Sequence, residues 1–359
     1  MRVVIAGGGT GGHLFPGLAV ARALKARVPG VRVSFAGTAA GIEARVVPTT
    51  EFDLDLIRSG GLKGKSATAL LRGFGLLPLS ALDAWRVITR RKPDVVIGVG
   101  GYSSGPMVAV AAARGIPTLL LEQNAVPGIT NRLLAPLVKS AAVTYDRSLR
   151  YFGAKGFVSG NPVRQEFLNV DDAALDADNV RVLIFGGSQG AHAINMAMVE
   201  AAPRLATAAA VSVVCQTGTR DYDMVREAFQ RSGVQGRVER FIDAMYREVG
   251  QAGLIVSRAG ATTLAEITAA GRPAILIPLP TATDDHQRKN AEALQAAGAA
   301  EVIEQDQLTG ALLASRILAL AADPDRRTSM SAAAKRLARP DAADRIADVV
   351  VELAGRRSS

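Results

Sequence analysis

Two stretches decide the fold: Val3-Val-Ile-Ala-Gly-Gly-Gly-Thr-Gly-Gly-His13 and Val182-Leu-Ile-Phe-Gly-Gly-Ser-Gln-Gly-Ala-His192. Each joins an apolar run typical of a buried strand to a glycine-rich turn and the start of a helical pattern. In open α/β sheets such turns lie at the carboxyl edge of the first strand, where ligands bind. The repetition predicts two Rossmann-like domains, each with one glycine loop.

The rest of the chain alternates short β-rich runs with longer segments rich in alanine and leucine. Strands separated by helices form parallel sheets with right-handed crossovers, so the predicted fold class is α/β. A chain of 359 residues also favours two domains. Gly160-Asn-Pro162 punctuates the chain at the expected joint. The further strands are predicted at 31–35, 95–97, 118–121, 211–215, 254–256 and 274–277.

The composition is that of a globular protein with an anionic partner. The chain is 48% hydrophobic and 21% charged, and its 42 basic and 33 acidic residues leave a net charge of +9. This excess favours a nucleotide, a phospholipid or a nucleic acid without choosing among them. Cys215 is the only cysteine and lies in an apolar run, so a buried thiol is expected and a disulfide within the chain is excluded.

The first glycine loop matches a dinucleotide-binding fingerprint in its letters only. Gly7-x-Gly9-x-x-Gly12 has the spacing, but Ala36-Gly37-Thr38 stands where a nicotinamide enzyme places an acid on the ribose. Residues 60–66 resemble a Walker A loop, yet Ser59 occupies the position of its first glycine. What remains is a general property: backbone N–H groups at a glycine-rich helix start can bind phosphate oxygens.

All three histidines fall in loops of this kind: His13, His192 and His286. For His192 and His286 an ordinary hydrogen-bonding role and a role at a site stay equally open. His13 directly follows the glycine loop and precedes Pro16 at an expected helix start, so we expect it to face a binding cleft.

An ordered set of motifs covers nearly the whole chain. Its members are Gly8-Gly-Thr-Gly-Gly-His13-x-x-Pro16-Gly-Leu-Ala19, Gly100-Gly-Tyr-Ser-Ser-Gly-Pro106, Glu122-Gln-Asn124, Gly160-Asn-Pro-Val-Arg164, Gly186-Gly-Ser-Gln-Gly190, Phe241-Ile242 and Ser257-Arg-Ala-Gly260 running on to Glu266. This set resembles the MurG family of N-acetylglucosaminyltransferases, which have the GT-B architecture of two Rossmann-like domains facing a cleft.

The resemblance implies that the two domains bind different substrates. Residues 1–162 would form an acceptor- and membrane-facing domain and 163–340 a domain that binds UDP-N-acetylglucosamine, while a helix at about 341–359 would pack back on the first. The implied activity is inverting transfer of N-acetylglucosamine to the C4 hydroxyl of lipid I, which gives lipid II in peptidoglycan synthesis. No cofactor and no metal are expected.

The resemblance places the donor site mostly in the C-terminal half. Uracil would lie near Ile242, the diphosphate near the Gly186–Gly190 loop, and Gln287 would reach sugar hydroxyls. Glu266 would accept both ribose hydroxyls with its two oxygens. The implied donor-binding residues are Thr10, Gly11, Gly12, Asn124, Arg164, Ser188, Ile242, Ala261, Thr262, Thr263, Leu264, Ala265, Glu266 and Gln287.

The acceptor side is implied in the N-terminal half, at Gly101, Tyr102, Ser103 and Ser104. The C4 hydroxyl would attack the anomeric carbon opposite the departing UDP, so no covalent enzyme intermediate is needed. The protein must take a proton from that hydroxyl and stabilise charge on the diphosphate. His13 is the candidate base or else holds the acceptor diphosphate.

Two departures from the family pattern affect donor contacts. His192 stands where relatives often carry Arg, and His286 precedes Gln287 where some members have a second Gln. Glu266 also has a plain alternative, because a Glu in the first turn of the helix predicted from Ala261 is favoured by the helix dipole.

Three rival functions share parts of this pattern. A UDP-N-acetylglucosamine 2-epimerase shares the fold and donor, but its carboxylates must reach the sugar ring. A two-lobed solute-binding protein also has paired halves, and the absence of a leader pattern after Met1 argues against export. A metal-dependent transferase needs an Asp-x-Asp site, yet Asp53-Leu-Asp55 lies in a strand pattern and Asp221-Tyr-Asp223 in a helical one.

Residues 63–92 are expected to dock the N-terminal domain on the inner membrane leaflet. Seven basic residues and one acid give this span a net charge of +6: Lys63, Lys65, Arg72, Arg86, Arg90, Arg91 and Lys92 against Asp83. Anionic lipids attract such a surface. The span also carries the apolar residues Leu70, Leu71, Phe74, Leu76, Leu77, Leu79, Leu82 and Trp85.

Two structures are open for this span. Gly73, Gly75 and Pro78 predict a loop or a helix break, whereas the alternative is an amphipathic helix that covers the sheet with its charges solvated. Because no apolar run approaches the roughly 18 residues that cross a bilayer, we expect a cytoplasmic protein with peripheral membrane contact. The expected partners are UDP-N-acetylglucosamine, lipid I and anionic phospholipid, with no nucleic acid.

Overall fold

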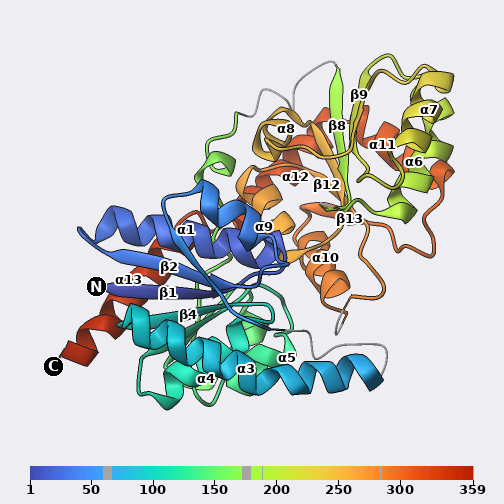
Figure 1. The fold of residues 1–359 in the computed structure, drawn as a ribbon. Coiled ribbons are helices and arrows are strands. Elements are labelled where there is room, and N and C mark those ends of the chain that lie inside the picture. Colours follow the sequence, from blue (N-terminus) through green and yellow to red (C-terminus); the bar gives the residue numbers. More distant parts are fainter. Residues whose placement is uncertain (60–66, 172–178, 188, 283–284, 359) are drawn as a thin grey trace. The chain divides into compact units, whose positions relative to one another are not determined.

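The structure is a computed structural model that describes residues 1–59, 67–171, 179–187, 189–282 and 285–358, with the backbone alone at 67–75 and 356–358. It divides into two compact units, drawn in Figure 1. The first unit is Met1–Arg164 with Arg339–Ser359, and the second is Gln165–Ala338. The sequence predicts that the first domain ends at residue 162 and that the second ends at residue 340.

The first unit is built on a seven-stranded parallel sheet in the order β3-β2-β1-β4-β5-β6-β7. Its strands are β1 (Arg2–Gly7), β2 (Arg32–Gly37), β3 (Asp53–Leu56), β4 (Val95–Gly100), β5 (Thr118–Glu122), β6 (Ser140–Val143) and β7 (Gly156–Val158). Its α-helices are α1 (Gly11–Arg27), α2 (Glu43–Val46), α3 (Ala67–Arg91), α4 (Ser104–Ala113), α5 (Ile129–Leu134) and α13 (Ala342–Ser358). Short 3-10 turns lie at Val47–Thr49, Asp146–Tyr151 and Gly153–Lys155.

The second unit repeats this plan with a six-stranded parallel sheet in the order β10-β9-β8-β11-β12-β13. Its strands are β8 (Val180–Phe185), β9 (Val211–Gln216), β10 (Gly236–Glu239), β11 (Leu254–Ser257), β12 (Ala274–Leu276) and β13 (Ala300–Val302). A 3-10 turn at Gln165–Phe167 opens the unit. Its helices are α6 (His192–Leu205), α7 (Tyr222–Ser232), α8 (Met245–Gln251), α9 (Ala261–Ala269), α10 (His286–Ala296), α11 (Gly310–Ala321) and α12 (Pro324–Leu337).

Each sheet is buried on both faces, as parallel sheets covered by crossover helices are. In β1, Val3 and Ile5 join the apolar cluster that contains residues of α1 and α13, while Val4 and Ala6 join the cluster beneath α3 and α4. The second sheet likewise separates two clusters. The two-domain α/β architecture predicted from the sequence is therefore confirmed.

The strand order places a topological switch point beside each glycine loop. The chain moves outward from β1 through β2 to β3 and then returns to β4 on the other side of β1. The second unit does the same about β8 and β11. At such points successive loops leave the carboxyl edge in opposite directions, which opens a ligand-binding crevice within the unit.

All the strands predicted from the sequence are present. The strands that the sequence did not reveal are β6, β7, β10 and β13. They have only three or four residues each, and β7 and β10 have no fully buried residue. Such segments carry too little apolar periodicity to stand out from loops.

The expected break in the basic span is wrong, because α3 runs without interruption through Gly73, Gly75 and Pro78. Each glycine costs only about 1 kcal/mol in a helix. Tertiary packing can outweigh this and the backbone bond lost at Pro78, since Ala84 and Ile88 lie in the core beneath the helix. The segment is thus one helix, as the amphipathic-helix alternative has it, although Arg90 and Arg91 are paired with Asp55 and not simply solvated. Among the described residues, no helix is both long enough and apolar enough to cross a bilayer.

Helix α13 returns to the first unit after the chain has built the second. Ile346 and Val350 are fully buried in the cluster with α1, and Arg27 of α1 holds Asp344 at 3.0 Å and Asp348 at 2.5 Å. The apolar face of α13 thus completes one side of the first core.

Ile346→Ala should therefore lower the free energy of unfolding of the first unit by about 2–5 kcal/mol, because it leaves a cavity between α13 and α1. Urea denaturation followed by the fluorescence of Trp85, the chain's only tryptophan, reports on this unit. Val351→Ala, on the exposed face of the same helix, is the matched control and should stay within about 0.5 kcal/mol. Equal losses in the two variants would contradict this packing.

Candidate functional site

The first glycine loop is shaped by backbone contact with the β4–α4 loop. Gly7 and Gly8 have φ values of 144° and 146°, which L side chains rarely adopt. A Cβ on Gly7 would lie 2.3 Å from the Gly100 carbonyl oxygen, and one on Gly101 would lie 2.3 Å from the Gly8 carbonyl oxygen. The Gly8 N–H donates to the Gly100 carbonyl at 3.2 Å. Glycine is therefore required on both sides of this contact.

His13 lies in the first turn of α1 and against the end of β4. A Cβ on Gly100 would be 2.6 Å from His13 Cδ2 and 2.9 Å from Nε2. The His13 Nδ1 atom is 3.3 Å from the Thr10 hydroxyl, and the residue is partly exposed. The structure thus brings Thr10, Gly11, Gly12 and His13 beside the loop predicted to bind the acceptor.

The four residues of that loop differ in what they can present to a ligand. Tyr102 is 55% exposed and Gly101 is half-buried, whereas Ser103 and Ser104 are buried. Ser103 is the residue that precedes α4, so it lies at a helix start. Of the four, Tyr102 is therefore the residue that is most exposed to a ligand.

Asn124 is held by the buried carboxylate of Glu122, which was not among the site residues predicted from the sequence. Glu122 accepts hydrogen bonds from the Asn124 N–H at 2.9 Å, from the Gly128 N–H at 3.1 Å and from Asn131 Nδ2 at 2.8 Å. Burial raises the pKa of Glu122, and the hydrogen bonds oppose that rise. The Glu122-Gln-Asn124 motif was the signal that could have identified it.

Arg164 is the last residue of the first unit. Its guanidinium lies over the ring of Phe15, 4.4 Å from the centroid, beside the start of α1. The sequence assigned Arg164 to the C-terminal domain and to the donor diphosphate.

The second glycine loop packs against the end of β9. Gly187 and Gly190 have positive φ values of 97° and 74°, and a Cβ on Gly190 would lie 1.8 Å from the Thr217 carbonyl oxygen. Helix α6 begins two residues later at His192. Ser188, a predicted donor contact, lies outside the described residues. The loop has the same glycine-dependent construction as the first one.

Gln216 joins this loop to Ile242 and was not predicted. The side chain is 2% exposed; its Nε2 donates to the Gly187 carbonyl at 2.9 Å and its Oε1 accepts from the Ile242 N–H at 2.7 Å. One buried amide therefore fixes both the proposed diphosphate loop and the proposed uracil contact. A polar residue at the end of a buried strand was the available signal.

His192 has a structural partner in Asp221. Its Nδ1 is 3.0 Å from Asp221 Oδ1, and Asn195 Nδ2 donates to the other carboxylate oxygen at 2.8 Å. Burial opposes the charge of Asp221, but the hydrogen bonds from Asn195 and His192 lower its pKa on balance. The ordinary hydrogen-bonding role left open for His192 is thus present in the structure.

The predicted sugar and ribose contacts lie on α9 and α10. Ala261, Thr262 and Leu264 are buried, while Thr263, Ala265 and Glu266 are half-buried. Glu266 is the sixth of nine helical residues and the first turn contains no acid, so the helix-dipole explanation of this residue is wrong.

Gln287 follows His286, which is the first residue of α10. Its amide oxygen accepts from the Ala259 N–H at 3.3 Å and from the Leu279 N–H at 3.1 Å. The amide nitrogen is therefore the end of Gln287 that can serve as a donor to a ligand.

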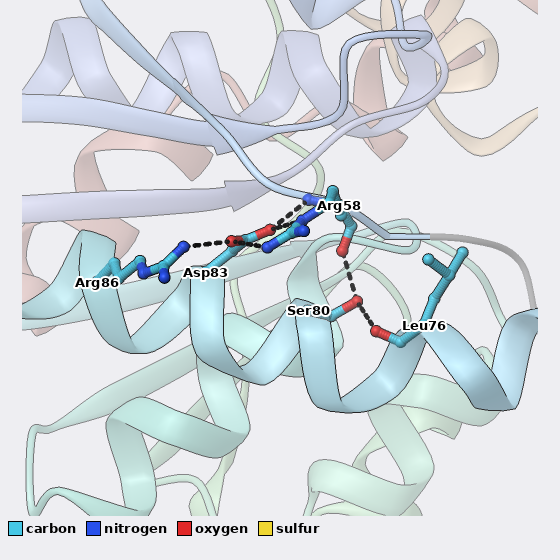
Figure 2. A network of polar contacts seen from close by, with 5 residues as sticks. All are labelled: Arg58, Leu76, Ser80, Asp83 and Arg86. Carbon is cyan, nitrogen blue, oxygen red and sulfur yellow. Dashed lines mark hydrogen bonds and ion pairs between the residues drawn. The ribbon is translucent and has the colours of Figure 1, made fainter.

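A polar network ties α3 to Arg58, in the segment that follows β3 (Figure 2). Asp83 accepts from the Arg58 backbone N–H at 3.0 Å and from two guanidinium nitrogens at 2.8 and 2.7 Å. These bonds hold the pKa of Asp83 to about 2. Ser80 donates to the Arg58 carbonyl at 2.5 Å, and Ser59 donates to the Tyr102 carbonyl at 2.7 Å.

The Asp-x-Asp pair on β3 is engaged by arginines of the basic span. Arg91 contacts Asp55 at 2.7 Å and Asp53 at 2.7 Å, and Arg90 also pairs with the buried Asp55. Arg90 and Arg91 were expected to face a membrane, but they also offset the negative charges of the two aspartates on β3. Within the described ranges, no group of three or more His, Cys, Asp and Glu side chains could hold a metal ion.

The expected buried thiol is confirmed. Cys215 is fully buried in β9, and burial raises its pKa to about 12, so it is protonated near neutral pH.

Comparison with known proteins matches both units to one family. Residues 3–143 match the glycosyltransferase family 28 N-terminal domain, and residues 181–346 match the glycosyltransferase family 28 C-terminal domain. A UDP-N-acetylglucosamine–N-acetylmuramyl-(pentapeptide) pyrophosphoryl-undecaprenol N-acetylglucosamine transferase of Anaeromyxobacter sp. (strain K) is 47% identical over 99% of this chain and 94% of its own length.

Solved structures show the same likeness. The crystal structure of Acinetobacter baumannii MurG has a TM-score of 0.78 and 30% identity, over 98% of this chain and 99% of its own. A putative UDP-N-acetylglucosamine 2-epimerase from Listeria monocytogenes has a TM-score of 0.70 over 96% of this chain and 94% of its own, but only 16% identity. The second likeness shows a shared fold alone.

Proposed function

Because this chain belongs to glycosyltransferase family 28, and to the MurG proteins within it, we propose that it transfers N-acetylglucosamine from UDP-N-acetylglucosamine to the C4 hydroxyl of lipid I. The observation that carries this proposal is the 47% identity over 99% of this chain, a span that contains both glycine loops. The epimerase alternative has only the fold in its favour.

The second unit is proposed to bind the donor. The start of α6, which follows the Gly186–Gly190 loop, supplies N–H groups for a diphosphate, which is the ligand that such a helix start favours. Ile242, fixed through Gln216 to the same loop, is the proposed uracil contact. Glu266 is proposed to accept hydrogen bonds from the ribose hydroxyls. The amide nitrogen of Gln287 is proposed to donate a hydrogen bond to a hydroxyl of the N-acetylglucosamine ring. Residues 261–265 supply the helix around Glu266.

The first unit is proposed to bind the acceptor. Its loop at Gly101–Ser104 and its glycine loop lie in backbone contact, so one diphosphate could reach N–H groups of both helix starts. This unit is also proposed to contact the donor substrate UDP-N-acetylglucosamine, through Thr10, Gly11, Gly12, Asn124 and Arg164. His13, in contact with Gly100, is the proposed base or diphosphate ligand.

The proposed reaction is a direct displacement. An inverting transfer requires removal of a proton from the acceptor hydroxyl and stabilisation of charge on departing UDP. A partly exposed imidazole beside the acceptor loop can accept the proton, because general-base catalysis is most often carried out by histidine. Fixed amides at the start of α6 can stabilise the leaving diphosphate without rearranging.

The direct test is transfer of labelled N-acetylglucosamine from UDP-N-acetylglucosamine to a soluble lipid I analogue. The proposal requires a disaccharide product that depends on the acceptor. Formation of a 2-epimer without transfer would support the alternative and overturn this function.

In the same assay, Glu266→Ala should lower kcat/KM for the donor by roughly 10- to 100-fold, which corresponds to a total loss of about 1.5–3 kcal/mol for hydrogen bonds to a charged group. The dependence on acceptor concentration should change little. Equal effects on the two substrates would instead indicate a role in folding.

His13→Ala should reduce turnover by about 100-fold or more if the imidazole is the base, while donor binding stays near the wild-type value. Single-turnover kinetics and UDP binding by calorimetry separate these quantities. Near-normal turnover would remove the base assignment and leave His13 a positioning role at most.

The first unit is also proposed to dock on anionic phospholipid at the cytoplasmic face of the membrane through α3. Leu77, Leu79, Leu82 and Trp85 of this helix are 42%, 39%, 43% and 52% exposed. The Arg114 guanidinium lies 4.4 Å from the Trp85 ring centroid, so a cation adjoins the apolar surface. Apolar residues bordered by cations suit an anionic bilayer. Lys63 and Lys65, which also entered the predicted charge, lie outside the described residues.

Leu82→Ser/Trp85→Ser should weaken binding to anionic vesicles by about tenfold or more, since both side chains lose their burial in lipid. Co-sedimentation measures this, with activity on the soluble acceptor retained. Val351→Ser, which alters an exposed apolar residue of α13, is the control. Arg90 and Arg91 are unsuitable for charge reversal because they pair with Asp55. Undiminished binding of the double variant would place the docking surface elsewhere.

A further inference from the structure

Glu43, the first residue of α2, has a fully buried side chain that joins two loops. Its Oε2 accepts from the Gly9 N–H at 2.7 Å, in the β1–α1 loop. Its Oε1 accepts from the Thr38 N–H at 2.8 Å and from the Thr38 hydroxyl at 3.0 Å, in the loop after β2. Both carboxyl oxygens are therefore used, one for each loop.

Three glycines leave the room that this carboxyl group occupies. A Cβ would lie 2.3 Å from Glu43 Oε2 at Gly8, 2.3 Å from Glu43 Cγ at Gly37 and 2.2 Å from Oε2 at Gly41. A side chain at any of these positions would displace the carboxyl group. The glycines of two separate loops are thus explained by one buried acid.

The partners of Glu43 that the described residues provide are neutral donors. A buried carboxylate without a cation depends on its hydrogen bonds, which are roughly twice as strong as those between neutral groups. Those bonds in turn demand that the Gly9 N–H point at Oε2. A displacement of Gly9 would therefore cost free energy, because it would break a hydrogen bond to a buried carboxyl group.

Gly9 is followed directly by the proposed site. On the other side of the loop, Gly8 meets the backbone of Gly101, so the segment is confined between Glu43 and the β4–α4 loop. Thr10 precedes α1, and its hydroxyl is within reach of the His13 ring. Fixing Gly9 therefore fixes where the helix start and His13 lie.

We infer that Glu43 is a positioning residue for the transfer reaction: it holds the first glycine loop in the arrangement that presents Thr10–His13 to substrate. This inference rests on the proposed function for its kinetic consequence. The acid that a nicotinamide enzyme would place after β2 is absent there; instead an acid from α2 reaches beneath the loop.

Glu43→Gln separates this role from simple space filling. Glutamine has nearly the same shape but only one acceptor oxygen. Thr38 offers two donors to the side chain and Gly9 offers one, so we expect the amide oxygen to face Thr38 and the NH₂ group to face the Gly9 N–H, which then loses its acceptor. We expect kcat to fall by about tenfold or more, as for loss of a hydrogen bond to a charged group. Amide hydrogen exchange should also rise in the peptide spanning Gly8–His13.

Thr38→Val is the matched control, because it removes one bond to Oε1 and leaves the Gly9 bond intact. It should keep kcat within about twofold and leave exchange at Gly8–His13 unchanged. If Glu43→Gln fails to fold, Glu43→Asp provides the second variant: the shorter side chain cannot reach both loops and should show the same two changes.

Unchanged exchange at Gly8–His13 in a folded Glu43 variant would overturn the inference, whatever its activity. Equal kinetic losses in Glu43→Gln and Thr38→Val would also overturn it, since they would indicate general packing. An inactive wild type would count against the proposed function, and the exchange comparison would still decide the role of Glu43.

Discussion

The architecture depends on a backbone contact that only glycine permits. At the switch point of the first sheet, Gly7 and Gly8 lie against Gly100 and Gly101, with distances that no Cβ could tolerate. Because these loops meet, the starts of α1 and α4 are brought to one edge of one sheet. In the second unit Gly190 meets the Thr217 carbonyl in the same manner. A side chain at these positions would separate the loops whose N–H groups are proposed to bind phosphate.

The glycines allow each loop many backbone conformations, and a hydrogen bond with a buried polar side chain restricts it to one. Glu43 restrains the first loop at Gly9, and Gln216 restrains the second at Gly187. The two side chains come from different places, a helix start and a strand end, but both hydrogen-bond to the backbone of a glycine loop. Preorganised amides can stabilise developing charge without rearrangement, so these restraints are part of the chemistry we propose.

Local patterns predicted the long elements and the glycine loops, because period and turn composition are local properties. Long-range partners were not predictable in this way. The engagement of Asp53 and Asp55 by Arg90 and Arg91, across more than thirty residues of chain, appears only when β3 and α3 are packed. Pro78 gave a misleading local signal because the core beneath α3 outweighs it. Motif order predicted the family and function, whereas neither Gln216 nor Glu43 belongs to one of those motifs.

The central claim is that a UDP-sugar binds at the carboxyl edge of the second sheet, against its glycine loop and α9. Amide hydrogen exchange of the full chain with and without UDP-N-acetylglucosamine tests this most directly. The account predicts slower exchange in the peptides that cover Gly186–His192 and Gly260–Glu266 when the nucleotide is bound. Protection absent from both peptides at a nucleotide concentration that supports turnover would contradict it.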